Sequence, residues 1–195
     1  CWQSLGRLQP RMLNFLENHD EQRIASDFFA GSASGGYAAL AVSLLLNKAP
    51  FMLYAGQEFG ERGMDNEGFS GCDGRTTIFD YWSVDSVRRG YYYRREMTET
   101  ERNVEDIYRK VLTIATQEKA VVSGDDFDLM YENRHLSGRQ FAFLRKADED
   151  ILLVVANFSD NRVEIPVKIP AHAFNHLHIC EGMYDAKDLL SGQTY

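Results

Sequence analysis

The sequence has only three cysteines among its 195 residues. Cys1, Cys72 and Cys180 are odd in number and widely spaced, which fits neither a disulfide framework nor the paired spacing of a zinc site. We therefore predict no metal site and no cofactor in this chain. The cysteines leave the cellular compartment open.

Basic residues are in the minority, because 21 Lys and Arg stand against 29 Asp and Glu and give a net charge of -8. A phosphate backbone attracts a basic surface, so this balance argues against non-specific nucleic-acid binding and leaves a neutral polar ligand compatible. A long unbroken apolar run is also lacking. The longest one, GYAALAVSLLLNKAPFMLYAG, is interrupted by Asn47, Lys48 and Pro50, so no membrane span is predicted.

The first ten residues contain no initiator Met and no charged segment leading into an apolar one, so no signal peptide is predicted. We expect the chain to begin inside a longer gene product. Hydrophobic residues make up 44% of the chain and charged residues 26%, which is typical of a globular protein that can bury a sizeable core.

The first third of the chain alternates between short apolar runs and helical patterns. Met12 to Leu16 and Pro50 to Tyr54 are predicted to be buried strands, while Glu21 to Phe29 and Gly35 to Leu46 are predicted to be helical. Strand, helix and strand joined by short links are typical of a parallel sheet that is buried on both faces. The order therefore predicts a βα layered or barrel fold.

A long segment rich in Gly, Asp, Arg and aromatics follows, and then apolar residues recur at helical spacing from Val104 to Val122. After Gly124 the period changes to two, most strictly over residues 163–169, and turn residues separate the runs. This pattern predicts a small antiparallel β-sandwich in which Pro166 and Pro170 mark an edge strand. We predict two domains, residues 1–122 and 123–195.

The stretch FLENHDEQR places Asn18, His19 and Asp20 directly after the first predicted strand. Two interpretations are open from the residues alone. Asp20 could be the N-cap of a following helix, with Asn18 and His19 satisfying backbone groups at the strand end. Alternatively, the three side chains form a catalytic corner, because barrel enzymes place active-site residues at the carboxyl ends of their strands.

FLENHDEQR resembles the strand-seven motif of the α-amylase family of glycoside hydrolases, and LYAGQEFG, from Leu53 to Gly60, is similar to that family's strand-eight motif. The order of the two motifs and the trailing β-domain also match, although Ala49 stands where the family commonly has Gly. The resemblance implies the C-terminal part of a (β/α)8 TIM barrel, with strands seven and eight and their helices, followed by a small antiparallel β-sandwich.

The resemblance also implies roles for residues of the first motif. Asp20 would be the carboxylate that stabilises the positive charge developing on the sugar, and His19, Asn18 and Arg23 would bind the substrate. The family's nucleophile and general acid have no match in this sequence, where GRTTIFD has Thr77 in place of an aspartate. The chain would therefore be an inactive fragment of a retaining hydrolase acting on starch or maltooligosaccharides.

Further implications concern partners. Calcium is frequent in the family, but its commonest site draws on segments that this sequence does not contain. The remaining N-terminal portion of the barrel would be a partner, and without it exposed sheet edges would favour self-association. The alternative is a non-catalytic carbohydrate-binding or structural β-sandwich module. Tyr81 and Trp82 would stack on a sugar or pack a loop, and GYYYRRE, from Gly90 to Glu96, is predicted to be a solvated or partner-facing helical segment.

Overall fold

The computed structural model describes residues 2–65, 72–76, 78, 83–136 and 138–195, without the side chains of residues 2–4. Contacts within the chain divide it into two units, the first made of residues 1–40 and 49–109 and the second of residues 41–48 and 110–195. The predicted domain boundary after residue 122 stays a prediction. In chain order, the described elements are η1 (Trp2–Arg11), β1 (Asn14–Phe15), η2 (Ala33–Gly36), α1 (Tyr37–Leu45), β2 (Phe51–Met52), η3 (Gln57–Phe59), α2 (Asp85–Tyr91), η4 (Arg94–Glu96), α3 (Glu99–Gln117), α4 (Lys119–Val122), β3 (Asp125–Asp128), η5 (Arg134–Leu136), β4 (Gln140–Ala147), β5 (Asp150–Asn157) and α5 (Ala171–Leu177), where η denotes a 3₁₀ helix.

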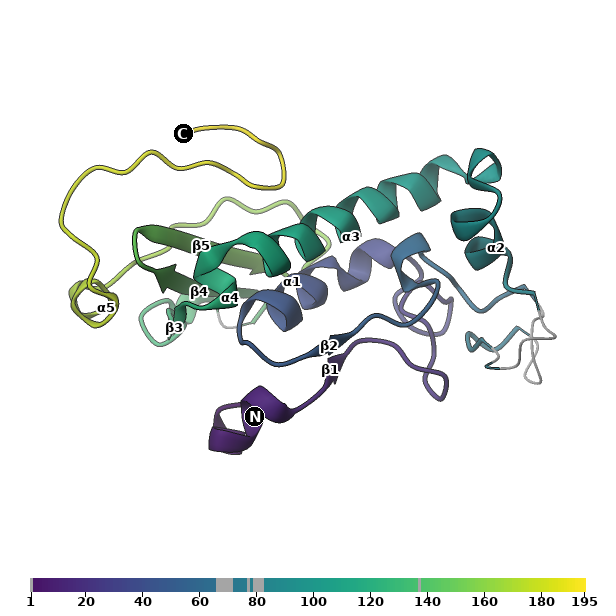
Figure 1. Ribbon diagram of the computed structural model, residues 1–195, viewed down its shortest axis with the longest axis horizontal. Helices are drawn as coiled ribbons and strands as arrows, with labels where there is room; N and C mark the ends of the chain where they lie inside the picture. Colours follow the sequence, from purple (N-terminus) through teal and green to yellow (C-terminus); the bar gives the residue numbers. More distant parts are fainter. Residues whose placement is uncertain (1, 66–71, 77, 79–82, 137) are drawn as a thin grey trace. The chain divides into compact units, whose positions relative to one another are not determined.

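Strands β1 and β2 form a parallel pair in the first unit, with Asn14 opposite Phe51 and Phe15 opposite Met52 (Figure 1). Helix α1 lies between them in sequence, so the predicted order of strand, helix and strand with parallel pairing is confirmed. The predicted burial of both strands is wrong, because Phe15 in β1 is 46% exposed and β2 is half-buried. Among the described residues, β1 and β2 pair only with each other, and each keeps one open edge. The self-association expected from such edges stays a prediction.

The helix predicted from Glu21 to Phe29 is wrong, because this segment forms turns. The N–H groups of Ser26 and Phe29 donate three residues back, to Arg23 and Ser26, as turns do, and two others donate outside the segment. The N–H of Arg23 donates to the carbonyl of Gly74 at 2.7 Å, and the N–H of Ile24 donates to the Glu17 carboxylate at 2.8 Å. These contacts hold the backbone away from a helical ladder.

The helix predicted from Val104 to Val122 is present as α3 and α4, with Glu118 between them. A capping box starts α3: the Thr98 hydroxyl accepts the N–H of Glu101 at 3.1 Å, and the Glu101 carboxylate accepts the N–H of Thr98 at 2.7 Å. No helix of the described residues combines the length and the apolar character needed to cross a membrane.

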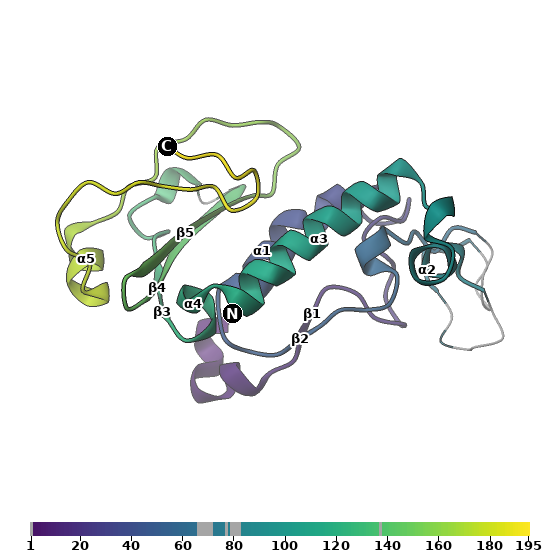
Figure 2. The same cartoon turned by 45° about the horizontal axis from the view of Figure 1, so that its top comes forward.

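The second unit contains a three-stranded antiparallel sheet in the order β3, β4, β5, and α5 contacts β3 (Figure 2). One face of this sheet carries a buried apolar cluster that includes Leu129, Leu136 and Leu144. The described residues of this region hold one sheet, so the predicted sandwich stays a prediction.

The strand predicted over residues 163–169 is also wrong, although its apolar side chains do pack against the cluster. Pro166 and Pro170 have no N–H to donate to a ladder. The buried Asn133 amide takes the place of a neighbouring strand at one residue, because it accepts the N–H of Lys168 at 2.7 Å and donates to the Lys168 carbonyl at 2.8 Å.

Arg145 on β4 is 1% exposed and donates to four backbone carbonyls at the ends of two helices. These are the carbonyls of Leu46 beyond α1, Ala120 and Val121 in α4, and Gly124 beyond α4, at 2.7 to 3.2 Å. Burial lowers the pKa of this guanidinium, although the acidic groups of Asp126 and Asp125 act in the opposite direction. The side chain satisfies carbonyls that a helix end leaves without partners.

Candidate functional site

The loop that follows β1 carries the predicted catalytic corner, and the Asn18 side chain shapes it. The Asn18 Oδ1 accepts the backbone N–H groups of Asp20 and Glu21, both at 2.9 Å. This is the local turn that Asn forms readily. Asp20 is not a helix N-cap, because Asn18 makes the backbone contacts and no helix follows in residues 21–29.

His19 and Asp20 project outward from this turn. The His19 side chain is 50% exposed and the Asp20 side chain 76% exposed, with 3.4 Å between the His19 Nε2 and the Asp20 Oδ1. The Asp20 carbonyl accepts the Nε–H of Arg75 at 2.8 Å, which ties the loop to the segment around residue 75. The backbone of the corner is therefore anchored, while the carboxylate and the imidazole are free to meet a ligand.

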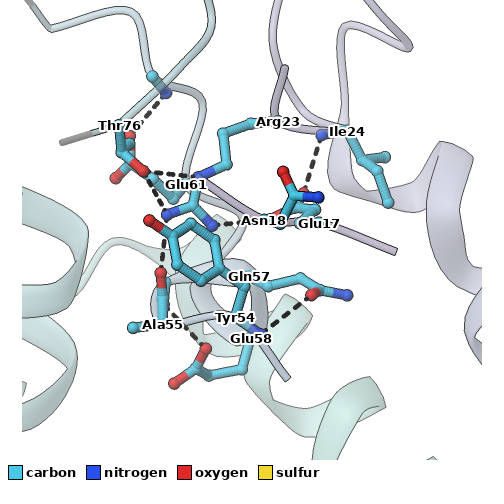
Figure 3. A network of polar contacts seen from close by, with 12 residues as sticks. Glu17, Asn18, Arg23, Ile24, Tyr54, Ala55, Gln57, Glu58, Glu61 and Thr76 are labelled. Atoms are coloured by element: carbon cyan, nitrogen blue, oxygen red, sulfur yellow. Dashed lines mark hydrogen bonds and ion pairs between the residues drawn. The ribbon is translucent and has the colours of Figure 1, made fainter. Parts of the chain in front are cut away.

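A buried ion pair lies beneath the corner. The Arg23 Nη1 donates to the Glu17 Oε2 at 2.7 Å, and the two side chains are 2% and 3% exposed (Figure 3). Glu17 uses its other oxygen to accept the N–H of Ile24. Burial raises the pKa of the Glu17 carboxyl, even though the neighbouring Arg23 acts to lower it. A charge pair this deep holds its geometry only because both partners are satisfied.

Arg23 also joins the loop after β1 to the loop after β2. Its Nη2 donates to the carbonyl of Ala55 at 2.8 Å, and its Nε and Nη2 donate to the Thr76 hydroxyl at 3.0 and 2.6 Å. The guanidinium carbon lies 4.2 Å from the centre of the Tyr54 ring. We call Glu17, Arg23, Tyr54, Ala55 and Thr76 the buried frame, after its buried members Glu17, Arg23 and Thr76; Tyr54 is half-buried and Ala55 is exposed. The planar fork of Arg23 spans three segments at once, which a lysine would not do.

The loop after β2 contains the second motif, and its acidic and amide side chains support the loop itself. The Glu58 Oε2 accepts the N–H of Gly56 at 3.0 Å, and the Tyr91 hydroxyl donates to the Glu58 Oε1. The Gln57 amide donates to the Tyr108 hydroxyl at 3.1 Å. Gly56 has φ of 91°, a conformation that favours glycine. Glu58 is 8% exposed, so the geometry favours a supporting role over contact with a sugar.

Glu61 provides similar support one turn further on. Its Oε1 accepts the N–H of Gly63 at 2.7 Å, and Ser86 at the start of α2 donates to its Oε2. Glu61 is 3% exposed. Glu17, Glu58 and Glu61 are thus buried and bonded to protein, whereas the Asp20 side chain is exposed, as are those of Glu21 and Asp27.

The structure brings Asn18, His19 and Asp20 together and places Arg23 below them, facing protein. The predicted contact between Arg23 and a substrate stays a prediction, and the burial of Arg23 favours a positioning role. Sequence reasoning missed Glu17, Tyr54 and Thr76. A carboxylate inside an apolar run, six residues before an arginine, was the one local signal for Glu17. Tyr81 and Trp82 lie outside the described residues, as does Thr77.

The exposed pair of His19 and Asp20 suits a neutral, hydroxyl-rich ligand. An ionised carboxylate accepts hydrogen bonds through both oxygens, and an imidazole offers one donor and one acceptor. Across the part of the chain that the structure describes, no group of three or more His, Cys, Asp or Glu side chains could hold a metal ion.

No family model matches the sequence, and no curated protein matches it. Among solved structures, the crystal structure of AmyP in complex with maltose aligns with a TM-score of 0.65 at 20% sequence identity. The alignment covers 98% of this chain and 38% of the AmyP chain. The likeness shows a shared, amylase-like fold, and this chain spans well under half the length of AmyP.

Proposed function

We propose that this chain is part of a retaining glycoside hydrolase that acts on α-glucans, and that Asp20 is its transition-state-stabilising carboxylate. The observation that carries the proposal is the exposed Asp20 and His19, held at the carboxyl end of a parallel strand by a buried frame. That is where barrel enzymes place their active-site residues. AmyP, whose fold this chain shares, was crystallised with maltose.

The chemistry assigned to the corner is electrostatic. In retaining hydrolysis, positive charge develops on the sugar as the glycosidic bond breaks. The Asp20 carboxylate, carried on a backbone that Asn18 and Arg75 anchor, would stabilise that charge. His19 would donate to a sugar hydroxyl from the same turn.

Asp20 cannot complete this reaction alone. A retaining mechanism needs a nucleophile and an acid about 5 to 5.5 Å apart across the scissile bond. The buried Glu17, Glu58 and Glu61 already hold loops together, so we assign neither role to them. The nucleophile and the acid would come from the remaining portion of the barrel, of which this chain would supply the last two βα units, followed by the β-sandwich.

The test is a titration of the isotope-labelled 195-residue chain with maltohexaose, followed by backbone amide shifts, together with an assay on a chromogenic maltooligosaccharide. We expect shifts at residues 18–21, their loss in Asp20→Ala, and no release of chromophore. Asp27→Ala is the matched control, because the Asp27 side chain is 58% exposed in the same unit. Turnover that disappears in Asp20→Asn would mean that the missing carboxylates lie within this chain.

A second candidate function is carbohydrate binding by residues 123–195 without chemistry. It is favoured by a surface cluster of rings, in which Tyr131 lies 5.2 Å from His172 and 6.2 Å from Phe127 between ring centres. Tyr131 is 43% exposed. If Tyr131→Ala abolishes maltohexaose binding by the whole chain and Asp20→Ala does not, this second function is the better one.

A further inference from the structure

Six consecutive residues at the end of α2 line a hollow of about 470 Å³, which we call the tyrosine hollow. A volume of this size lies within the range of small-ligand sites. The lining residues are Tyr91, Tyr92, Tyr93, Arg94, Arg95 and Glu96.

The three tyrosines of the hollow are unusually open to solvent. Tyr91 is 56% exposed, Tyr92 80% and Tyr93 52%. Single exposed aromatic residues need no explanation, but rings that gather around one concavity mark an interaction site. Tyrosine also offers a broad contact surface with a polar end and loses little conformational entropy on binding.

The hollow is held from beneath by specific contacts. The Tyr91 ring meets Phe59 edge to face at 5.2 Å, and its hydroxyl donates to Glu58 in the loop after β2. Burial, together with the bond to Glu58, raises the pKa of Tyr91 to about 12, so the hydroxyl stays a donor at neutral pH. Arg88 lies 5.0 Å from the centre of the Tyr93 ring. Tyr91 and Tyr93 are therefore positioned before any ligand arrives.

Two charged side chains that line the hollow form ion pairs with neighbouring residues. Arg94 donates to Glu105 at 2.7 Å and to the Gly90 carbonyl at 2.8 Å. Glu96 accepts from Arg88 at 3.4 Å. Arg94 and Glu96 are thus paired with protein groups, Arg95 adds a guanidinium to the lining, and the net charge of -8 on the chain disfavours a strongly anionic ligand.

We propose that the tyrosine hollow binds a short segment of neutral α-glucan, separately from the loop that carries Asp20. A pyranose ring presents an apolar face that suits the Tyr92 ring, and its hydroxyls suit the guanidinium and carboxylate groups at the rim. The choice of an α-glucan rests on the proposed function, whereas the choice of a neutral sugar rests on the hollow itself. Tyr91 links the hollow to the loop after β2, because its residue lines the hollow and its hydroxyl contacts Glu58.

The experiment uses the whole 195-residue chain, labelled with ¹⁵N and titrated with maltohexaose and, separately, with cellohexaose. We expect maltohexaose to shift the amides of residues 91–96 and Tyr92→Ala to weaken that binding about fivefold, the size of one lost ring contact. Tyr92→Phe should bind like the parent chain. Tyr195→Ala is the matched control, because Tyr195 is 75% exposed and lies in the other unit.

The two proposals fail separately. Shifts at residues 18–21 without shifts at 91–96 would overturn the hollow and leave the proposed function standing. Shifts at 91–96 that persist in Asp20→Ala, without shifts at 18–21, would support the hollow and remove the proposed role of Asp20. Equal affinity for cellohexaose would overturn the assignment to an α-glucan. If neither sugar shifts the amides of residues 91–96, the proposed binding site is wrong.

Discussion

Replacing Glu17 by Gln removes one charge from an ion pair whose side chains are 3% and 2% exposed. The Arg23 guanidinium then stays buried without a counter-charge, and only the Thr76 hydroxyl, the Ala55 carbonyl and the new amide accept from it. Breaking a buried pair in this way costs about 3 to 5 kcal/mol of the free energy of unfolding. We expect Glu17→Gln to lower the free energy of unfolding by an amount in that range.

The opposite change should behave differently with pH. Arg23→Met leaves Glu17 buried alone, but a carboxylate can take up a proton and a guanidinium cannot lose one. Burial already raises the pKa of Glu17, so its folded pKa lies above its unfolded pKa. In Arg23→Met, the stability that protonated Glu17 contributes is fully present below its unfolded pKa. It is lost as pH rises through its folded pKa.

Urea unfolding followed by circular dichroism at about pH 5 and about pH 8 measures both effects. Arg23→Met should cost less at the lower pH, while the cost of Glu17→Gln should be similar at both. The Ile24 amide, which donates to Glu17, should also exchange its hydrogen faster in both variants. The control is Asp27→Asn in the exposed pair with Arg62, which should cost less than about 1 kcal/mol.

The double change Glu17→Leu with Arg23→Met removes both charges at once. Its cost should be smaller than the sum of the two single costs, because neither charge is left unpaired in the interior. Strict additivity, or a cost below about 1 kcal/mol for Glu17→Gln, would refute the reasoning that the buried frame is a coupled charge pair.

Four further outcomes are expected. Gly90→Ala places a Cβ 2.3 Å from the Phe59 ring and should cost about 1 to 3 kcal/mol in urea unfolding, whereas Gly138→Ala, with open space around it, should cost little. Arg145→Met leaves four helix-end carbonyls without their donor and should cost at least about 3 kcal/mol, and an unchanged urea midpoint would contradict that capping role. Burial acts to raise the pKa of Glu101, but hydrogen bonds from Arg89 and from the start of the helix outweigh burial and lower this pKa. The stability that the ionised carboxylate contributes is therefore present above the unfolded pKa of about 4.3 and is lost as pH falls through the folded pKa. Glu101→Gln should flatten the acid limb of a stability profile. The open edges of the parallel strand pair should make the chain self-associate at micromolar concentration, which a single monomeric boundary in sedimentation would contradict.

Sequence patterns correctly predicted the secondary-structure elements that depend on residues close together in the chain. The apolar period from Val104 to Val122 gives a helix, and the capping box between Thr98 and Glu101 explains where that helix starts. The parallel pairing of β1 and β2 also followed from the order of elements, since a strand, a helix and a strand with short links leave few other arrangements. The position of the Asp20 corner after β1 came from the same order.

Where the sequence patterns predicted the wrong element, contacts between residues far apart in the chain set the backbone conformation. Residues 163–169 alternate like a strand, yet their backbone partner is the Asn133 side chain, and two prolines remove ladder donors. Residues 21–29 look helical, yet Gly74 accepts the N–H of Arg23 and Glu17 accepts that of Ile24. Periodicity records only which side chains prefer burial, and it carries no information about which distant group will accept a given N–H.

The sequence by itself determined that a carboxylate, an imidazole and an amide follow a short apolar run, because adjacent residues stay adjacent in any fold. Only the tertiary structure decided which of them meets solvent. Asp20 is exposed and Arg23, three residues later, is buried, because the arginine finds Thr76 and the Ala55 carbonyl far along the chain. Burying a charge is favourable only where the fold supplies its partners, and those partners come from segments that meet only after folding.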